Sequence, residues 1–297
     1  MLRRASNLVL TACFLGLIAL PLGLNMAGID GADPDAENRT LAPWPALDGS
    51  LDSIGRFGNG FGHWFEDHFG MRARLIRWYG ITRYFGLGVS PAPTVAIGRD
   101  GWLFYMEDGA LDDYTHEHLM DDEELATWRG MIARASAWCQ ARGITYLFAF
   151  APDKYTIYPE YFPDTIRQLS PVSRADQVMT ATTDLGVVID LRQRLLQHRD
   201  EERLFHVTDT HWNPRGAFHA YQQIMENLHA RHPKVPPPKQ RDELDAVIRQ
   251  APGMDLAGMI GLKRVLGEDD LRYNPKVPRQ YVVRVPDGGY ATGGDPV

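Results

Sequence analysis

The sequence predicts an α/β protein in which helices flank a mostly parallel sheet, with an additional apolar helix at the N-terminus. Two runs, 144–150 and 187–191, are apolar at most positions, which is typical of strands covered by helices on both faces. Amphipathic segments alternate with these runs, and this alternation favours a parallel α/β arrangement. The charge-free stretch 8–24 predicts the additional N-terminal helix.

The N-terminal stretch has the features of an export signal. Arg3 and Arg4 precede the apolar residues 8–24, and no clear A-x-A cleavage site follows. We therefore expect an uncleaved signal anchor rather than a cleaved signal peptide, with a core helix of a soluble domain as the third possibility. Because basic residues stay on the cytoplasmic side, residues 8–24 are expected to anchor the chain in the inner membrane of a Gram-negative-type envelope, with the remainder in the periplasm. The predicted domains are 1–30, the signal anchor or signal peptide, and 31–297, the exported domain.

Beyond the leader, aromatic residues at helical spacing predict a helix over 53–85. We interpret its aromatic stripe as core packing, with a sugar-stacking platform as the alternative. Apolar periodicity predicts further helices, at 121–140, 175–186, 214–228, 242–250 and 256–262. Short strands are expected beside a glycine-containing turn and near the end of the chain, at 94–97, 102–105 and 280–285.

The net charge argues against a nucleic-acid partner, and the two cysteines argue against a stabilising disulfide. The net charge of the 297 residues is −7, which repels phosphate backbones, so we expect no nucleic-acid partner. Cys13 lies in the apolar leader and Cys139 in a predicted helix, so no disulfide is expected between them. The exported domain must therefore be stabilised by its hydrophobic core.

Asp209 and His211 are the residues whose pattern suggests catalysis. They follow an apolar strand-like run and precede a helix that begins at Pro214, which places them on a strand-to-helix loop. A carboxylate that accepts a hydrogen bond from imidazole Nδ1 fixes the tautomer and leaves Nε2 free as a general base. Asp209 would orient the ring and His211 would be the base. The alternative is a helix-capping Asp beside a packed His.

Weaker candidates surround this pair. Trp212 is expected to form a wall of the site or part of the core. Lys154 follows a predicted strand and could hold a sugar carboxylate, or it could be a surface lysine that covers apolar area; Arg215 has the same alternatives. His206 could join Asp209 and His211 in a metal site, but no second group of ligands has suitable spacing, so we predict neither metal nor cofactor.

Several separated segments together carry a family resemblance. In chain order they are Glu37-Asn38-Arg39, residues 65–70 with Arg72, residues 98–105, Ala151-Pro152-Asp153-Lys154 onward to Pro163, and residues 208–217. The chain resembles the alginate O-acetyltransferase family of SGNH-hydrolase-like proteins over about residues 37–262. This resemblance implies a circularly permuted SGNH-hydrolase-like fold and a role in O-acetylating an exported polysaccharide. It also implies a membrane acyl-transferase partner and matches Asp209 and His211 to two members of a Ser-His-Asp triad.

The third triad member departs from the family pattern. In the family, a serine block follows a late strand, whereas Ser173 is the last serine of this sequence. We therefore expect the exported domain to be truncated before its nucleophile. Two alternatives stay open: a non-catalytic polysaccharide-binding or scaffold protein of the same fold, and a hydrolase of acetyl esters in the cell envelope.

Overall fold

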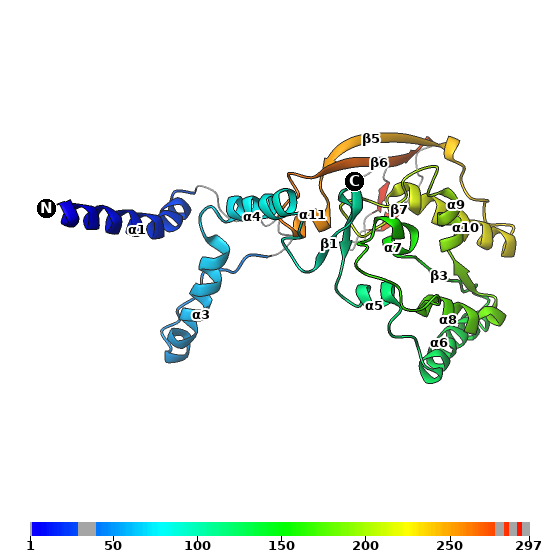
Figure 1. The fold of residues 1–297 in the computed structure, drawn as a ribbon. Coiled ribbons are helices and arrows are strands. Elements are labelled where there is room, and N and C mark those ends of the chain that lie inside the picture. Colours follow the sequence, from blue (N-terminus) through cyan, green and yellow to red (C-terminus); the bar gives the residue numbers. More distant parts are fainter. Residues whose placement is uncertain (1, 29–39, 277–281, 285–289, 293–297) are drawn as a thin grey trace. The chain divides into compact units, whose positions relative to one another are not determined.

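The computed structural model describes residues 2–28, 40–276, 282–284 and 290–292 (Figure 1). The chain divides into two compact units, one made of residues 1–97 and 253–266 and the other of residues 98–252 and 267–297. The domain boundary predicted at residue 30 lies outside the described residues, as does the Glu37-Asn38-Arg39 segment.

The first unit is helical in its described part. Its elements are α1 (Leu2–Met26), α3 (Leu51–His68), α4 (Arg72–Ile81), the π-helical η1 (Thr82–Gly86), the short strand β1 (Val95–Ile97) and α11 (Asp255–Met259). Within α1, the stretch Ala5–Met26 is long and apolar enough to cross a membrane, and none of it is buried. This exposed apolar surface agrees with a signal or anchor segment, because an exposed stretch of this kind is unfavourable in water.

The helix expected over 53–85 is divided in the structure. Phe69 ends α3, and Met71 adopts a left-handed backbone (φ 66°) before α4 begins. Gly70 occupies the break, where an added Cβ would lie 2.2 Å from the carbonyl oxygen of Pro21. Three aromatic rings of α3 contact the ring of Trp44 edge-on, at centroid distances of 4.7 to 6.2 Å; they belong to Phe57, Phe61 and Trp64. The stripe therefore packs against Trp44 but is not part of a buried core, because Trp44 and Phe61 are both exposed.

The second unit alternates strands and helices through its first half. Its elements up to residue 198 are η2 (Arg99–Gly101), β2 (Leu103–Tyr105), α5 (Ala110–Thr115), α6 (Asp122–Gln140), β3 (Phe148–Phe150), α7 (Lys154–Ile157), η3 (Pro159–Tyr161), α8 (Arg174–Ala181), η4 (Thr183–Leu185), β4 (Val188–Asp190) and α9 (Arg192–His198). The start of α6 is fixed by Asp121, which forms a capping box with Glu124. β3 and β4 pair in parallel, with Phe148 opposite Val188.

The second half of this unit contains a long hairpin-like pair of strands. Its elements are α10 (Pro214–Arg231), η5 (Arg241–Glu243), β5 (Leu244–Pro252), β6 (Gly267–Pro275), β7 (Val282–Arg284) and β8 (Tyr290–Thr292). β5 and β6 pair antiparallel along their whole length (Figure 1), so the helix predicted at 242–250 is wrong. Pairing with β6 supplies the backbone hydrogen bonds that a local reading of 242–250 could not anticipate. The late strand predicted at 280–285 is present as β7.

The mostly parallel sheet is not confirmed. Among the described residues of this unit, the β3–β4 pair is parallel, whereas β5–β6 and β7–β8 are antiparallel. The buried cluster of Ile189, Leu191 and Ala220 joins β4 to α10, with Trp212 packed against its edge. This packing holds α10 and Trp212 in place, and the candidate site described below directly precedes Trp212 in the chain.

Candidate active site

Residues 206–211 form a closed loop whose two ends are joined. Phe205 and Trp212 make an antiparallel bridge, and the His206 N–H donates to the His211 carbonyl (3.2 Å). Immediately after the loop, the Asn213 side chain accepts from the N–H groups of Arg215 and Gly216 and so caps α10. The loop therefore has a defined beginning and end, and the helix after it begins at Pro214, as the sequence predicted.

Within this loop, Asp209 and His211 form the hydrogen-bonded pair that the sequence predicted. Asp209 Oδ1 lies 2.7 Å from His211 Nδ1 and also accepts from the His211 backbone N–H at 3.0 Å. Burial raises the pKa of Asp209, but the hydrogen bonds from His211 outweigh this effect and hold that pKa below its usual value. Asp209 is thus a carboxylate at neutral pH, and its contact with Nδ1 favours the tautomer that carries the proton there.

The two side chains of the pair differ strongly in exposure. The side chain of Asp209 is 10% exposed, whereas that of His211 is 74% exposed. In the part of the chain that the structure describes, no group forms a hydrogen bond with His211 Nε2. The hydroxyl of Ser173, the last serine in the sequence, donates to Asp176 at the start of α8. Nε2 therefore faces solvent and can accept a proton from an incoming hydroxyl.

Lys154 does not have the surface position expected of it. It is 3% exposed, and its ammonium donates to the backbone carbonyls of His206, Val207 and Asp209 (2.6 to 3.2 Å). Burial lowers its pKa to about 7, against the opposing effect of the Glu268 and Asp209 carboxylates. Because its N–H groups face the loop, neither the sugar-binding nor the surface interpretation describes this placement.

The structure adds Glu268, which the sequence reading did not identify. Glu268 is 5% exposed on β6 and accepts hydrogen bonds from the Val207 N–H (2.8 Å) and from the Thr208 hydroxyl (2.7 Å). Burial raises its pKa, but the adjacent His206 ring and the hydrogen bonds from Thr208 and Val207 outweigh burial and lower the pKa to about 2. Some sixty positions separate it from the loop, so no local motif could have indicated the contact.

Loss of the Glu268 charge is expected to weaken the fold in acid. Since its folded pKa is below the ordinary glutamate value, its stabilisation is present above about pH 4.5 and is lost as the pH falls toward 2. Between pH 6 and pH 3 this loss should be about 2 kcal/mol. Urea unfolding of the wild type and of Glu268→Gln at both pH values measures it: the variant should lose about that much less stability than the wild type. Equal losses in the two proteins would contradict the assignment.

Trp212 and Arg215, the remaining predicted site residues, have different surroundings. Trp212 helps to line a cavity of about 970 Å³, together with other aromatic and cationic side chains: Phe218, Tyr221, Tyr273, Lys239 and Arg272. Arg215 is instead held among carboxylates, with its guanidinium 3.6 Å from both Glu202 and Asp269. Trp212 therefore borders a cavity, and Arg215 forms ion pairs with carboxylates of the chain.

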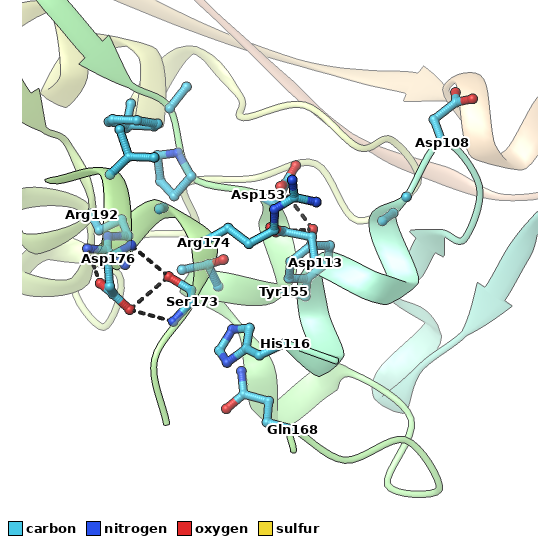
Figure 2. Close-up of a pocket in the computed structure, with 18 of the residues that line it drawn as sticks. Asp108, Asp113, His116, Asp153, Tyr155, Gln168, Ser173, Arg174, Asp176 and Arg192 are labelled. Atoms are coloured by element: carbon cyan, nitrogen blue, oxygen red, sulfur yellow. Dashed lines mark hydrogen bonds and ion pairs between the residues drawn. The ribbon is translucent and has the colours of Figure 1, made fainter. Parts of the chain in front are cut away.

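A second cavity, of about 770 Å³, lies between α5, α8 and the segment that begins α7 (Figure 2). Asp113 and Asp153 both contact the Tyr155 hydroxyl there, at 2.8 and 2.9 Å. Burial and the neighbouring Asp113 raise the pKa of Asp153. Neither Asp209 nor His211 lines this cavity, so it is distinct from the loop site.

His206, Asp209 and His211, the alternative metal site of the sequence analysis, do not form a group of potential ligands among the described residues. The described residues bring together one potential metal-binding group, the exposed Asp112, Glu117 and His118, whose ligand atoms lie within 4.8 Å of one another. His206 instead lies beside Glu268, with Nδ1 3.6 Å from Oε1.

Comparison with known proteins places this site in a family context. Residues 95–290 match the family model described as "SGNH hydrolase-like domain, acetyltransferase AlgX". The "probable alginate O-acetylase AlgJ" of Pseudomonas aeruginosa is 25% identical over 231 residues, which are 74% of this chain and 52% of the relative. The protein of the same description from Azotobacter vinelandii is 27% identical over 224 residues, 73% of this chain and 51% of the relative.

The chain spans about half the length of these two curated relatives. Among solved structures, it is similar to the O-acetyltransferase domain of Pseudomonas putida AlgJ, with 22% identity, coverage of 62% of this chain and 66% of that one, and a TM-score of 0.44. The family match includes the whole 206–211 loop as well as Lys154 and Glu268.

Proposed function

Because the chain belongs to the SGNH hydrolase-like, AlgX-type acetyltransferase family, we propose that it takes part in O-acetylating an exported polysaccharide. Asp209 would orient His211, and His211 would act as the general base. The observation that carries this proposal is the 2.7 Å contact between Asp209 Oδ1 and His211 Nδ1, with the other ring nitrogen turned to solvent. Polysaccharide as substrate follows from the relatives, which are described as alginate O-acetylases.

The proposed chemistry needs only a base and a hydroxyl at this position. The hydroxyl oxygen attacks the carbonyl carbon of an acetyl donor while its proton passes to His211 Nε2. The leaving group of the donor then departs with that proton, and the acetyl group stays on the attacking oxygen. The role of His211 is the same whether the hydroxyl belongs to the sugar itself or to the serine nucleophile that the family resemblance implies, which has no counterpart after Ser173 in this sequence.

We further propose that the reaction takes place outside the cytoplasm. The apolar stretch Ala5–Met26 supports an anchor in the inner membrane, and the basic Arg3 and Arg4 favour a cytoplasmic N-terminus. A periplasmic position would bring the site to the exported polysaccharide, and a membrane acyl-transferase would deliver the acetyl group to it.

The cavity beside the loop supports polysaccharide binding, which is also the second candidate function. Trp212, Tyr221 and Tyr273 offer rings on which sugars can stack, and Lys239 with Arg272 offers positive charge. An acidic polysaccharide such as alginate, named in the description of the relatives, has carboxylates that suit these cations. If the chain does not catalyse transfer, polysaccharide binding in this cavity is the function that we propose instead.

Removing positive charge from the cavity that Trp212 lines is expected to weaken binding of acidic sugars. Arg272→Gln combined with Lys239→Gln should raise the Kd for an alginate oligosaccharide about 30-fold, because the two lost charge-assisted contacts contribute about 1 kcal/mol each. Isothermal titration calorimetry at low salt measures the change. Binding of a neutral oligosaccharide of equal length is the control, and an unchanged Kd for the acidic one would place its binding elsewhere.

The acetyl content of the exported polysaccharide tests the proposed function and separates its alternatives. In cells from which the gene has been deleted, acetyl groups released by mild alkali should fall to background and should return when the gene is restored. A rise in acetyl content would instead indicate a hydrolase of acetyl esters. Unchanged acetyl content with reduced amounts of exported polymer would favour a binding or scaffold role.

A further inference from the structure

Two buried charged residues from outside the loop contact the backbone on which Asp209 and His211 lie. Lys154, at the start of α7, has its ammonium above the rings of Trp102 and Phe104, 5.4 and 4.9 Å from their centroids. It donates to three loop carbonyls, of which the Asp209 carbonyl is nearest at 2.6 Å. An ammonium group has three N–H bonds, so these three carbonyls use all of them.

Glu268 provides the complementary contacts to the same loop. One carboxylate oxygen accepts from the Val207 N–H, and the other accepts from the N–H and the hydroxyl of Thr208. The Lys154 ammonium therefore binds backbone carbonyls, and the Glu268 carboxylate binds backbone N–H groups. All of these backbone groups belong to residues 206–209. The Val207 carbonyl receives an additional hydrogen bond from the Leu103 N–H at 2.9 Å.

The polar backbone groups of the loop explain why charged rather than apolar residues lie at these two buried positions. Burying two charged groups is expensive, and an apolar pair of similar volume often stabilises a fold equally well or better. An apolar pair, however, could not form the hydrogen bonds to the His206 and Asp209 carbonyls and to the Val207 amide. The charged pair holds one backbone conformation, and the direction of the Asp209 carboxylate depends on that conformation.

We propose that Lys154 and Glu268 are positioning residues for the Asp209–His211 pair. They fix the loop backbone so that Asp209 Oδ1 meets His211 Nδ1; neither touches the acetyl donor or the sugar. The inference deepens the proposed function and rests on it for its catalytic consequence. The structural part, that the hydrogen bond of the pair depends on Lys154 and Glu268, can be tested without any assay of acetylation.

The test is NMR of the full chain labelled with ¹⁵N in its histidine rings. The proton on His211 Nδ1 is assigned as the signal that disappears in His211→Ala. We expect this signal to be lost, or the ring to show a mixture of tautomers, in Lys154→Met and in Glu268→Gln. Lys234→Met and Asp270→Asn are the matched controls: Lys234 is exposed, Asp270 is on β6 and pairs with Arg272, and both variants should keep the signal.

A milder variant keeps the proposal testable if either substitution prevents folding. Thr208→Val has nearly the same shape and removes the Thr208 hydroxyl, which donates to Glu268 at 2.7 Å. It should shift the His211 Nδ1 proton signal while circular dichroism stays that of the wild type. A folded Thr208→Val chain, and folded Lys154→Met or Glu268→Gln chains, with unchanged His211 signals would overturn the proposal.

Acetyl content of the polysaccharide then separates this inference from the proposed function. Lys154→Met should reduce acetylation on the order of 100-fold, because small misplacements of reacting groups have effects of that size. If the His211 signal changes but acetylation does not depend on His211, the proposed function fails and the positioning role stands. If acetylation depends on His211 but not on Lys154 or Glu268, the positioning role fails.

Discussion

Asp209→Asn is expected to reduce acetylation of the polysaccharide by at least about 100-fold, and up to about 10⁴-fold. The neutral amide cannot stabilise the imidazolium that forms when His211 takes a proton. If the amide nitrogen faces the ring, it also favours the tautomer with the proton on Nε2, which is then no longer a base. The rate of acetyl incorporation in cells carrying the variant gene measures the effect.

The control for this substitution is Asp200→Asn, whose side chain is 89% exposed and pairs with Arg199. It removes the same charge from the chain without touching the loop, so acetylation should stay within about twofold of the wild type, as surface substitutions are usually tolerated. A wild-type rate in a folded Asp209→Asn protein would show that the carboxylate has no part in the reaction.

Phe205→Ala is expected to lower the free energy of unfolding by about 3–5 kcal/mol. Phe205 is 2% exposed, its ring contacts that of Tyr158 edge-on at 6.2 Å, and its backbone closes the loop by pairing with Trp212. Truncation would leave a cavity below the loop, because closely packed neighbours cannot fully collapse into the space. Urea unfolding followed by circular dichroism measures the loss.

Leu196→Ala on α9 provides the comparison, since Leu196 is 43% exposed. Leu196→Ala should lower the free energy of unfolding clearly less than Phe205→Ala does, because only part of the Leu196 side chain leaves water on folding. A loss for Phe205→Ala no larger than that for Leu196→Ala would mean that the base of the loop is not tightly packed.

The Asp209–His211 contact could be predicted because both residues belong to one short loop. An Asp two positions before a His in a short loop lies within reach of it in many backbone conformations. The strand expected before the loop is not formed: Phe205 makes only an isolated bridge with Trp212. Pro214 and the capping residue Asn213 also mark where the following helix begins. Local sequence therefore contained most of the information needed for this pair.

Lys154 and Glu268 could not be assigned in the same way. Each reaches the loop across more than fifty positions, and a burial of this kind depends on the tertiary fold. The position of Lys154 after a predicted strand favours a sugar contact or a surface lysine, since lysine is rarely buried. Nothing adjacent to Glu268 distinguishes it from Asp269 and Asp270, the next two acidic residues of β6.

The secondary-structure errors have a similar origin. The apolar runs 144–150 and 187–191 form shorter strands, β3 and β4, which pair in parallel as expected. The segment predicted as a helix at 242–250 becomes β5 because β6, about twenty residues later, provides a pairing partner over nine positions. Pairing between segments so far apart is not visible in local periodicity.

The most direct test of the account is the acetyl content of the exported polysaccharide in cells that carry His211→Ala. His63→Ala is the matched control, since the His63 side chain is also exposed, at 75%, and lies on α3. We expect the first variant to accumulate at the wild-type level yet leave the polysaccharide with about 1% or less of its acetyl groups, because a missing general base costs about 100-fold or more. We expect the second to leave acetylation unchanged. Normal acetyl content with His211→Ala would contradict the proposal that this histidine is the base.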